Sequence, residues 1–363
     1  MSEEYYSLDA IDSEDAQYNI IIGERSNGKT YQALRKIIIN WCSLHKQGAY
    51  IRRYHEDFRG KLGNEIFRNL IRNGEVLAIS EGKFDTIKYY SGRFHLGKFD
   101  SDLDKYVYEE EPFCYAFAIS EQEHVKSAGF PDVTTIVFDE FITRNYYLQN
   151  EFVDFMNLLS TIIRRRTDVK IYLLANTVNK YCPYFKEMGL KHISEMKQGT
   201  IDVYTYGSSK LRVAVEYCRS VTKKSKSSQL YFAFDNPSLA MITSGAWEVA
   251  RYPHCPIKYR TKDIIFIFFI LFDGQLLQCE IIEKDDISFL FIHEKSTALQ
   301  NEDVDIIFSD KYDPRPNWIR NLRKSPNPIC RKIAYYFKDD RVYYQDNDVG
   351  EIVRNYLNFC TTS

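Results

Sequence analysis

The residues whose types and spacing are best suited to chemistry lie near the amino terminus. Gly23 and Gly28 enclose four residues, and Lys29 and Thr30 follow directly. In this G-x-x-x-x-G-K-T pattern, backbone N–H groups surround phosphate oxygens, the lysine reaches the β- and γ-phosphates, and the threonine hydroxyl ligates Mg²⁺. We therefore predict a site for a nucleoside triphosphate and Mg²⁺, bound by Gly23, Glu24, Arg25, Ser26, Asn27, Gly28, Lys29 and Thr30.

Two adjacent carboxylates, Asp139 and Glu140, supply a second part of the same chemistry. They end an apolar run, Ile136-Val137-Phe138, as in the Walker B pattern. Asp139 is predicted to hold Mg²⁺, directly or through water, and Glu140 to activate the attacking water as general base. Two unpaired charges at the end of a buried strand would cost several kcal/mol or more. Metal and phosphate chemistry therefore explains them better than a plain surface turn.

Further polar residues follow at strand and helix ends. Asn176 ends the run Val169–Ala175, where a residue that senses the γ-phosphate is expected, although asparagine also ends strands simply by forming turns. Arg164 to Arg166 end an apolar helical segment, and such a charge run is usually solvated. The sharper alternative is an arginine finger that offsets transition-state charge on a neighbouring subunit. Arg52 and Arg53 face either ligand or solvent.

These groups require a sheet to position them. An apolar run at Ile20–Ile22 precedes the phosphate loop, and an apolar helical face follows it, formed by Leu34, Ile37, Ile38 and Trp41. Asp139 and Asn176 also end strand-like runs. Because ligands of open α/β sheets gather at the carboxyl ends of the strands, we predict an α/β domain with a mostly parallel sheet.

Composition excludes several classes of protein. The chain has 363 residues, 44% apolar, which suits a globular protein of two domains. Its net charge of −2 means that a nucleic-acid partner would need local basic patches. Eight cysteines without a C-x-x-C pair indicate reduced thiols, and the run Ile264–Phe272 is too short to span a bilayer. We expect an intracellular protein without a membrane partner.

In their order along the chain, these motifs resemble the DNA-packaging (encapsidation) ATPases of small Picovirinae-type tailed bacteriophages. Those proteins are terminase-like ATPases of the additional-strand, catalytic-glutamate P-loop class. The resemblance covers roughly residues 18–190 and is weaker from about residue 200 onward. It rests on the phosphate loop, Arg52-Arg53-Tyr54, Thr134–Phe141, Ile163–Arg166, Leu173–Asn176 and Pro183–Phe185.

The resemblance implies roles for residues that the local pattern leaves open. Arg164 falls where the family places its trans-acting arginine finger, with Arg166 as the fallback. Lys126 resembles a second trans-acting basic residue, although an ordinary loop lysine is an equal reading. The family implies a homo-oligomeric ring, typically a pentamer, seated on the portal of an empty capsid in the host cytoplasm. That ring hydrolyses ATP to thread double-stranded DNA inward, and packaging RNA is a further candidate partner.

The domains are expected at residues 1–197 for the ATPase, 198–228 for a linker and 229–363 for a smaller α+β, RNase H-like domain. A nuclease of that fold needs carboxylates in its central strand to hold two metals, and Phe266–Phe272 carries none. We therefore predict a nuclease-inactive docking domain. A basic and aromatic surface is a candidate for binding RNA or DNA, with a solvated helix face as the alternative: Arg315, Trp318, Arg320, Arg323, Lys324, Arg331 and Lys332.

Other functions compete with a DNA motor. A GTPase is disfavoured because the guanine-reading N-K-x-D motif is absent, and the nearest string, Asn179–Cys182, lacks its aspartate. A small-molecule P-loop kinase would transfer phosphate without any requirement for nucleic acid. An ATP-gated assembly protein would hydrolyse ATP only incidentally. ATPase rates measured with and without long duplex DNA separate these functions.

Overall fold

The computed structural model describes residues 6–125, 129–143, 147–148, 150–176, 182–219, 252–272 and 274–362. The chain forms two compact units, Met1–Glu248 and Val249–Ser363. Within the described residues, no helix combines the length and the apolar character that crossing a membrane requires. Each unit has its own sheet and is considered by itself.

A ten-stranded sheet forms the framework of the first unit, in the order β3-β4-β6-β2-β7-β8-β1-β10-β9, with β5 paired to β4. Its central strands, from β6 to β10, run parallel, whereas both edges are antiparallel. The strands are β1 Tyr18–Gly23, β2 Gln47–Arg52, β3 Thr86–Tyr90, β4 Arg93–Asp100, β5 Lys105–Tyr108, β6 Cys114–Ala118, β7 Val133–Asp139, β8 Lys170–Asn176, β9 Thr200–Tyr206 and β10 Leu211–Tyr217.

The order of the central strands confirms the predicted fold class. β8 lies between β1, which leads into the phosphate loop, and β7, which ends in Asp139. This inserted strand is what defines the additional-strand class of P-loop ATPases. Helices cover both faces of the central strands, and every residue of β1 is buried.

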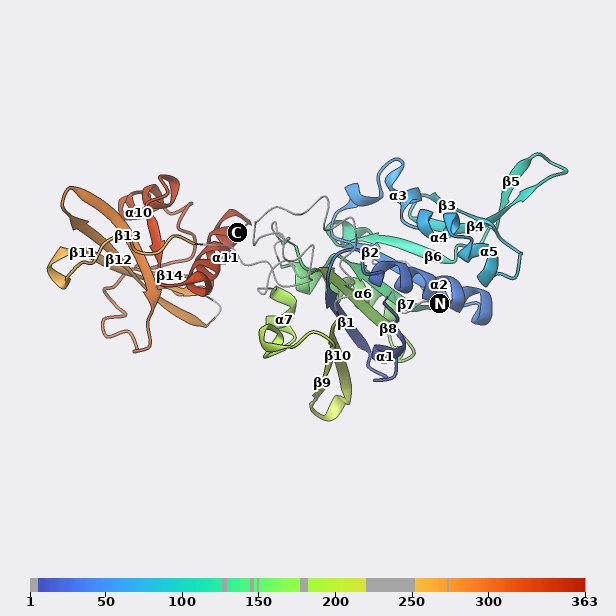
Figure 1. Cartoon of the computed structure of the whole chain (residues 1–363), viewed down its shortest axis with the longest axis horizontal. Helices are drawn as coiled ribbons and strands as arrows, with labels where there is room; N and C mark the ends of the chain where they lie inside the picture. The colour runs from blue at the N-terminus through green and yellow to red at the C-terminus, as the bar shows by residue number, and fades with distance from the viewer. Residues whose placement is uncertain are drawn as a thin grey trace. The chain divides into compact units, whose positions relative to one another are not determined.

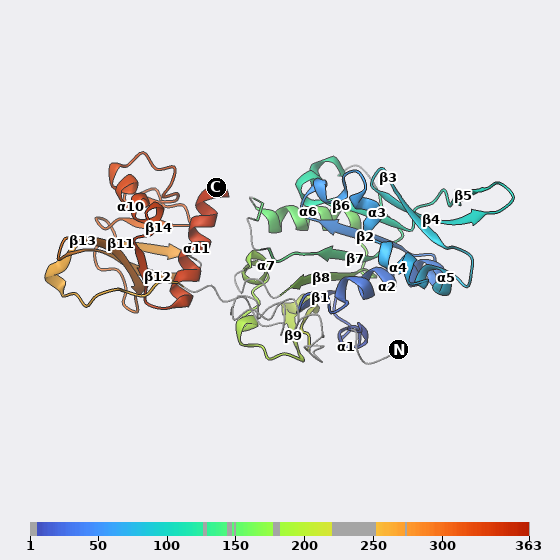
Figure 2. The ribbon, with the colours of Figure 1, turned by 45° about the horizontal axis from the view of Figure 1, so that its top comes forward.

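Helices cover the two faces of this sheet (Figures 1 and 2). On one face, α2 packs through Leu34, Ile37 and Ile38, and on the other α6 packs through Phe155 and Leu159. The described helices of this unit, including short 3-10 turns, are α1 Asp9–Asp12, α2 Lys29–Leu44, η1 His55–Phe58, α3 Leu62–Glu65, α4 Arg68–Arg72, α5 Glu75–Ile79, η2 Ile119–Val125, α6 Glu151–Ile163, α7 Pro183–Glu187, η3 Ile193–Glu195 and η4 Gly207–Ser209.

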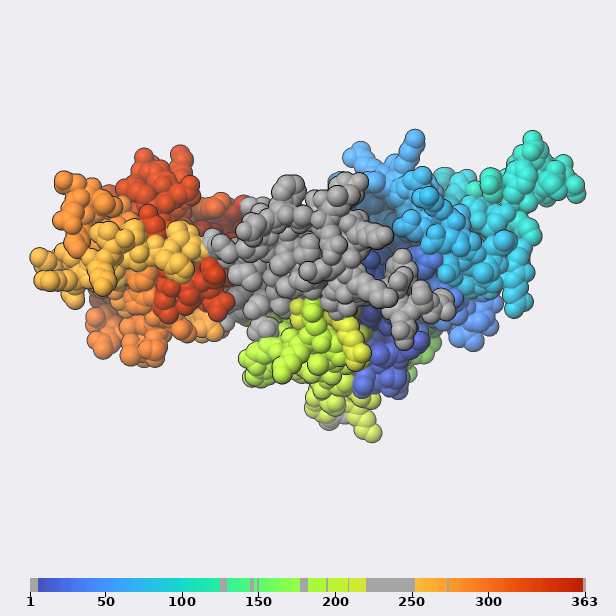
Figure 3. All heavy atoms as spheres, viewed as in Figure 1, coloured from blue at the N-terminus to red at the C-terminus, as the bar shows by residue number. Residues whose placement is uncertain are grey.

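One edge of this sheet projects as a hairpin. β4 and β5 pair from Gly97 opposite Tyr108 to Asp100 opposite Lys105, and they stand out from the body of the first unit (Figures 1 and 3). Acidic residues Asp102 and Asp104 lie exposed at the hairpin's turn. The turn of this hairpin is therefore acidic and solvated.

The other edge corrects the predicted linker. Residues 200–206 and 211–217 form β9 and β10, and β10 pairs in parallel with β1 from Tyr18 opposite Val213 to Ile22 opposite Tyr217. Most of the range 198–219 is therefore part of the ATPase sheet. The basic serine-rich stretch Lys223–Ser228, on which the linker prediction rested, lies outside the described residues.

A six-stranded sheet organises the second unit, in the order β15-β14-β11-β12-β13-β16. β11, β12 and β13 form an antiparallel meander, and β14 and β15 continue in parallel beside β11. This is the strand order of an RNase H-like sheet, as predicted. The elements are η6 Thr261–Asp263, β11 Ile264–Phe272, β12 Gln275–Lys284, β13 Ile287–Glu294, β14 Ile307–Ser309, β15 Trp318–Ile319, α10 Pro328–Lys338, β16 Val342–Tyr344 and α11 Asn347–Thr362.

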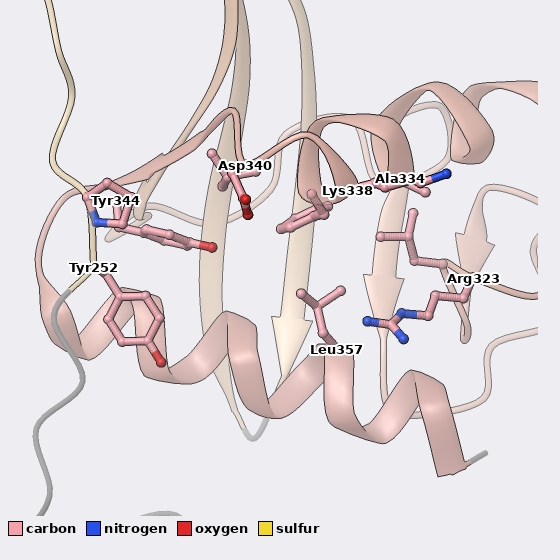
Figure 4. A pocket seen from close by; sticks show the side chains of 11 residues that line it. Tyr252, Arg323, Ala334, Lys338, Asp340, Tyr344 and Leu357 are labelled. Carbon is pink, nitrogen blue, oxygen red and sulfur yellow. The ribbon is translucent and has the colours of Figure 1, made fainter.

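A cavity of about 540 Å³ opens in the second unit and is lined by residues of α10, α11 and β16 (Figure 4). Tyr252 and Tyr344 stand at one side of this cavity, and Arg323 at the other. The Tyr252 ring packs so closely on Gly350 that a Cβ there would lie 2.2 Å from it. The first described residue of this unit is thus held against α11.

Candidate active site

The phosphate loop joins the carboxyl end of β1 to the first turn of α2. Gly28 precedes the helix with φ = 100°, a conformation that side chains rarely adopt. A Cβ on Gly23 would lie 2.8 Å from the Cβ of Cys218, which follows β10. Gly28 is therefore required by its backbone conformation and Gly23 by its close packing on Cys218, and the helix points its amino terminus into the loop.

Lys29 is buried inside this loop, with only 5% of its surface exposed. Its Nζ donates to the backbone oxygen of Glu24 at 2.7 Å and to Oδ1 of Asn27 at 3.0 Å. Burial lowers the pKa of Lys29 because water is withdrawn from the ammonium group. An anionic phosphate would replace neutral acceptors around this cation, which is the role the motif predicts.

Asp139 ends β7 directly opposite the start of α2. Its Oδ1 accepts a hydrogen bond from the Thr30 hydroxyl at 3.2 Å, and its Oδ2 accepts one from the Tyr50 hydroxyl at 2.8 Å. Burial raises the pKa of the Asp139 carboxyl, and the nearby charge of Arg52 opposes that rise. A threonine hydroxyl beside a buried carboxylate oxygen is the pair of oxygen ligands that Mg²⁺ favours.

Glu140 turns away from the strand direction, with φ = 59°. Its backbone N–H donates to Oδ1 of Asp139 at 3.0 Å, and its exposed carboxylate pairs with Arg52, whose NH2 lies 2.7 Å from Oε2. Arg52 also lies 3.6 Å from Oδ2 of Asp139. The strand end at Arg52 therefore faces the two Walker B carboxylates rather than solvent.

Arg53 points to the opposite face of the sheet, as the next residue of an extended chain must. It is buried and donates to both carboxylate oxygens of Glu151, at 2.8 and 2.9 Å. The same guanidinium donates to the backbone oxygens of Glu140 and Phe141, at 3.1 and 2.8 Å. The prediction that Arg53 faces ligand or solvent is wrong, because this side chain braces the turn that carries Glu140.

Asn176 lies beside the phosphate loop, because β8 pairs with β1 so that Asn176 stands opposite Gly23. Its Oδ1 is 3.5 Å from Nζ of Lys29. The structure thus brings together Lys29, Thr30, Asp139 and Asn176 at the carboxyl ends of the central strands β1, β7 and β8.

The arginine triplet lies away from this site, toward the amino ends of the strands. The 13 residues of α6 at about 1.5 Å each carry the chain some 20 Å back from Glu151, the partner of Arg53. Arg164 is exposed after this helix, and its NH2 lies 3.8 Å from a Cβ built on Gly129. NH2 of Arg166 instead donates to the backbone oxygens of Phe130, Val133 and Ile162. Lys126 lies outside the described residues.

These residues fit ATP and Mg²⁺. The loop presents a helix amino terminus and a buried lysine toward phosphate, and the edge beside it presents hydroxyl and carboxylate oxygens toward a divalent cation. In the part of the chain that the structure describes, no group of three or more His, Cys, Asp or Glu residues is arranged to hold a metal.

The predicted basic surface of the second unit is partly neutralised. The Arg315 guanidinium pairs with Asp313 at 2.9 Å, Asp303 at 3.1 Å and Glu302 at 3.5 Å, and it stacks over Trp318 at 4.7 Å. Arg320 lies over the Phe359 ring, and Arg323 donates to Thr361. Lys324, Arg331 and Lys332 are exposed.

Sequence reasoning missed the residues that hold the catalytic groups in place. Tyr50 donates to Asp139, and Glu151, which also accepts from Tyr184 at 2.9 Å, fixes Arg53. The available signal was alternation: Tyr50 and Arg52 share one face of a strand that ends beside the site.

Known proteins match this chain along almost its whole length. A family model described as podovirus DNA encapsidation protein (Gp16) matches residues 2–358. The DNA packaging protein of Bacillus phage PZA is 24% identical over 357 residues, which cover 97% of this chain and 95% of that protein. The DNA packaging protein of Bacillus phage phi29 matches with the same identity and coverage.

Solved structures share the fold. The Phi-28 gp11 DNA packaging motor matches with a TM-score of 0.57 and 18% identity, covering 100% of this chain and 99% of its own. The bacteriophage Phi-29 viral genome packaging motor assembly matches with a TM-score of 0.56 and 20% identity, covering 97% of each chain. Both matches extend over the two units.

Proposed function

The chain belongs to the podovirus DNA encapsidation protein (Gp16) family, and we propose that it is the ATP-hydrolysing motor that drives double-stranded phage DNA into an empty capsid. The observation that carries this proposal is the contact between the phosphate loop and the Walker B strand: Thr30 reaches Asp139 at 3.2 Å, with Glu140 the next residue. DNA is proposed as the cargo because the chain matches the DNA packaging proteins of phages PZA and phi29 over nearly their full lengths.

The chain's own groups divide the work of hydrolysis. Backbone N–H groups of residues 24–30 and Lys29 bind the phosphates, and Thr30 and Asp139 hold Mg²⁺. ATP supplies the phosphoryl group, and the metal offsets its charge. Glu140 orients the attacking water and accepts its proton. Asn176 lies beside Lys29, where its side chain senses the γ-phosphate. Before Glu140 can act as a base, its carboxylate must leave Arg52, which lies 2.7 Å away.

Arg164 acts on a neighbouring subunit. It lies about one α6 length from the carboxyl edge of its own sheet, so it is placed to reach a second copy rather than its own phosphate loop. Arg166 is less suited, because three backbone oxygens hold one end of its guanidinium. Lys126, which lies outside the described residues, is proposed as a second trans-acting residue on the family resemblance alone.

A finger in trans requires a ring with a head-to-tail interface. We propose a homo-pentamer on the portal of the procapsid in the host cytoplasm, with packaging RNA as a further component. The two structural neighbours are a DNA packaging motor and a genome packaging motor assembly, which supports an assembled state. The second unit serves docking without nuclease activity, since β11 carries no carboxylate.

The proposal is tested by ATPase rates with and without long duplex DNA. Wild-type chain should hydrolyse ATP faster with DNA, and Glu140→Gln should lose hydrolysis while still binding ATP. Arg164→Ala should also be inactive alone. Mixing these two inactive variants should restore part of the rate, because some interfaces then combine an intact Glu140 with an intact Arg164. Indifference to DNA would indicate a kinase or an assembly protein, and no recovery on mixing would remove the trans finger.

A further inference from the structure

Tyr50 lies in the middle of β2, beside the strand that carries the Walker B carboxylates. It is 3% exposed, and its ring packs edge-on against Phe58 at 6.1 Å between centroids. Its hydroxyl donates to Oδ2 of Asp139 at 2.8 Å. Oδ1 of the same carboxylate faces the other way and accepts from the Thr30 hydroxyl and the Glu140 N–H, at 3.2 and 3.0 Å.

We propose that Tyr50 is a positioning residue that fixes the rotation of the Asp139 carboxylate, so that Oδ1 faces Thr30 and is the oxygen offered to Mg²⁺. This inference rests on the magnesium–nucleotide site proposed above. It assigns a role in metal affinity to a residue that contacts neither phosphate nor metal.

A tyrosine is suited to this role because its ring is rigid and locked by packing. The terminal torsion of an aspartate is broad and roughly two-fold, so the carboxylate needs an external partner to hold one orientation. Arg52 is a poorer partner: its NH1 lies 3.6 Å from Oδ2, and its NH2 is bound to Glu140. Partners that orient metal ligands in this way typically change metal affinity about 10- to 100-fold.

The simpler explanation is that a buried hydroxyl takes the nearest acceptor. The same sheet provides a control for this explanation. Tyr172 on β8 is 1% exposed, and its hydroxyl donates to Oδ1 of Asp12 at 2.6 Å, outside the candidate site. Tyr172→Phe removes a partly buried tyrosine–aspartate hydrogen bond without touching Asp139.

The test measures binding of a fluorescent ATP analogue to the full-length chain during Mg²⁺ titration. Tyr50→Phe should raise the half-saturating Mg²⁺ concentration by about 10-fold or more and leave binding in EDTA unchanged. Tyr172→Phe should keep the wild-type Mg²⁺ dependence. In the Asp139→Asn background, adding Tyr50→Phe should have no further effect, because the hydroxyl acts through that carboxylate.

A wild-type Mg²⁺ dependence in Tyr50→Phe, or an equal shift in Tyr172→Phe, would overturn the inference. Replacing Tyr50 by 4-aminophenylalanine keeps the ring and a donor, so it should retain the wild-type dependence. A loss there would also overturn the inference, and this variant is informative even if Tyr50→Phe does not fold. Absence of any Mg²⁺-dependent nucleotide binding by the wild-type chain would instead refute the proposed function.

Discussion

Arg52 contacts both carboxylates at the end of β7, and this places a cation on the group that we propose as catalytic base. The Arg52 guanidinium lies 2.7 Å from Oε2 of Glu140, so this carboxylate oxygen is engaged in an ion pair and is not available to a water molecule. The structure therefore shows Glu140 in a restrained arrangement. We propose that hydrolysis requires Arg52 to move to another partner when nucleotide or cargo is bound.

Arg52→Ala should remove this restraint. We expect the ATPase rate without DNA to rise several-fold and the stimulation by DNA to shrink, because Glu140 no longer waits for release. Steady-state rates with and without duplex DNA measure both quantities. Arg68→Ala, which removes an exposed ion pair with Glu65, is the matched control and should leave both unchanged. A fall in the basal rate would show that Arg52 assists hydrolysis instead.

Glu151 is the residue on which the brace behind Glu140 depends. It is 2% exposed and accepts from Arg53, Tyr184 and the backbone N–H of Leu148. Glu151→Ala leaves the buried Arg53 guanidinium without its carboxylate, which should cost about 3–5 kcal/mol of unfolding free energy. Urea unfolding checks this value, with Glu65→Ala as a control that should not shift the midpoint. Equal midpoints for the two variants would contradict the bracing role.

At the scale of elements, the two strands β2 and β7 act together. Tyr50 and Arg52 of β2 point to one face of the sheet, and Arg53, the residue after β2, points to the other. This one segment therefore orients Asp139, restrains Glu140 and braces the turn that carries Glu140. The phosphate loop depends on neighbours in the same way, because Cys218 after β10 closes its back. The catalytic edge is thus assembled by five adjacent strands rather than by the loop alone.

In the second unit, β12 and β13 are joined by a titratable pair. His293 and Glu280 lie 3.4 Å apart on paired strands. The hydrogen bond to Glu280 raises the pKa of His293. Burial raises the pKa of Glu280, but hydrogen bonds from His293, Tyr259 and Gln278 outweigh it, and the pKa is lowered overall.

The sign of the pH dependence follows from these shifts. The raised pKa of His293 stabilises the fold below about pH 6.5, and this contribution is lost as pH rises through the folded-state pKa. The lowered pKa of Glu280 stabilises it above about pH 4.5. Thermal unfolding of the full chain should therefore show His293→Gln lowering the melting temperature more at pH 5.5 than at pH 8.5. Equal losses at both values would contradict the pairing.

At the scale of the whole molecule, the sequence predicted what is marked locally. Gly28, Thr30, Asp139 and Asn176 each follow a single apolar run, so their places in the phosphate loop, at the start of α2 and at strand ends could be read one segment at a time. The contact of Tyr50 with Asp139 could not, because it joins residues 89 positions apart through the register of β2 and β7. The pairing of β10 with β1 could not be read either, because it joins segments far apart in the chain, and it places β9 and β10 in the ATPase sheet.

The separation of Arg164 from the phosphate loop within one chain suggests that the working unit is an interface between two copies. Lys29, Asp139 and Glu140 lie at the carboxyl ends of the central strands, whereas Arg164 follows α6 toward the amino ends. A complete site would need the phosphate loop and Walker B carboxylates of one copy and Arg164 of a second copy. Hydrolysis in one subunit would then depend on the position of the next, as a coordinated ring requires.

The most direct test is DNA packaging by mixed rings on portal-bearing procapsids. Wild-type chain and Glu140→Gln are mixed in known ratios, and nuclease-protected DNA inside the capsids is measured. We predict that packaging falls much more steeply than the wild-type fraction, because one inactive subunit stalls its neighbours. A decrease in simple proportion to the wild-type fraction, or packaging that persists with Glu140→Gln alone, would contradict the account.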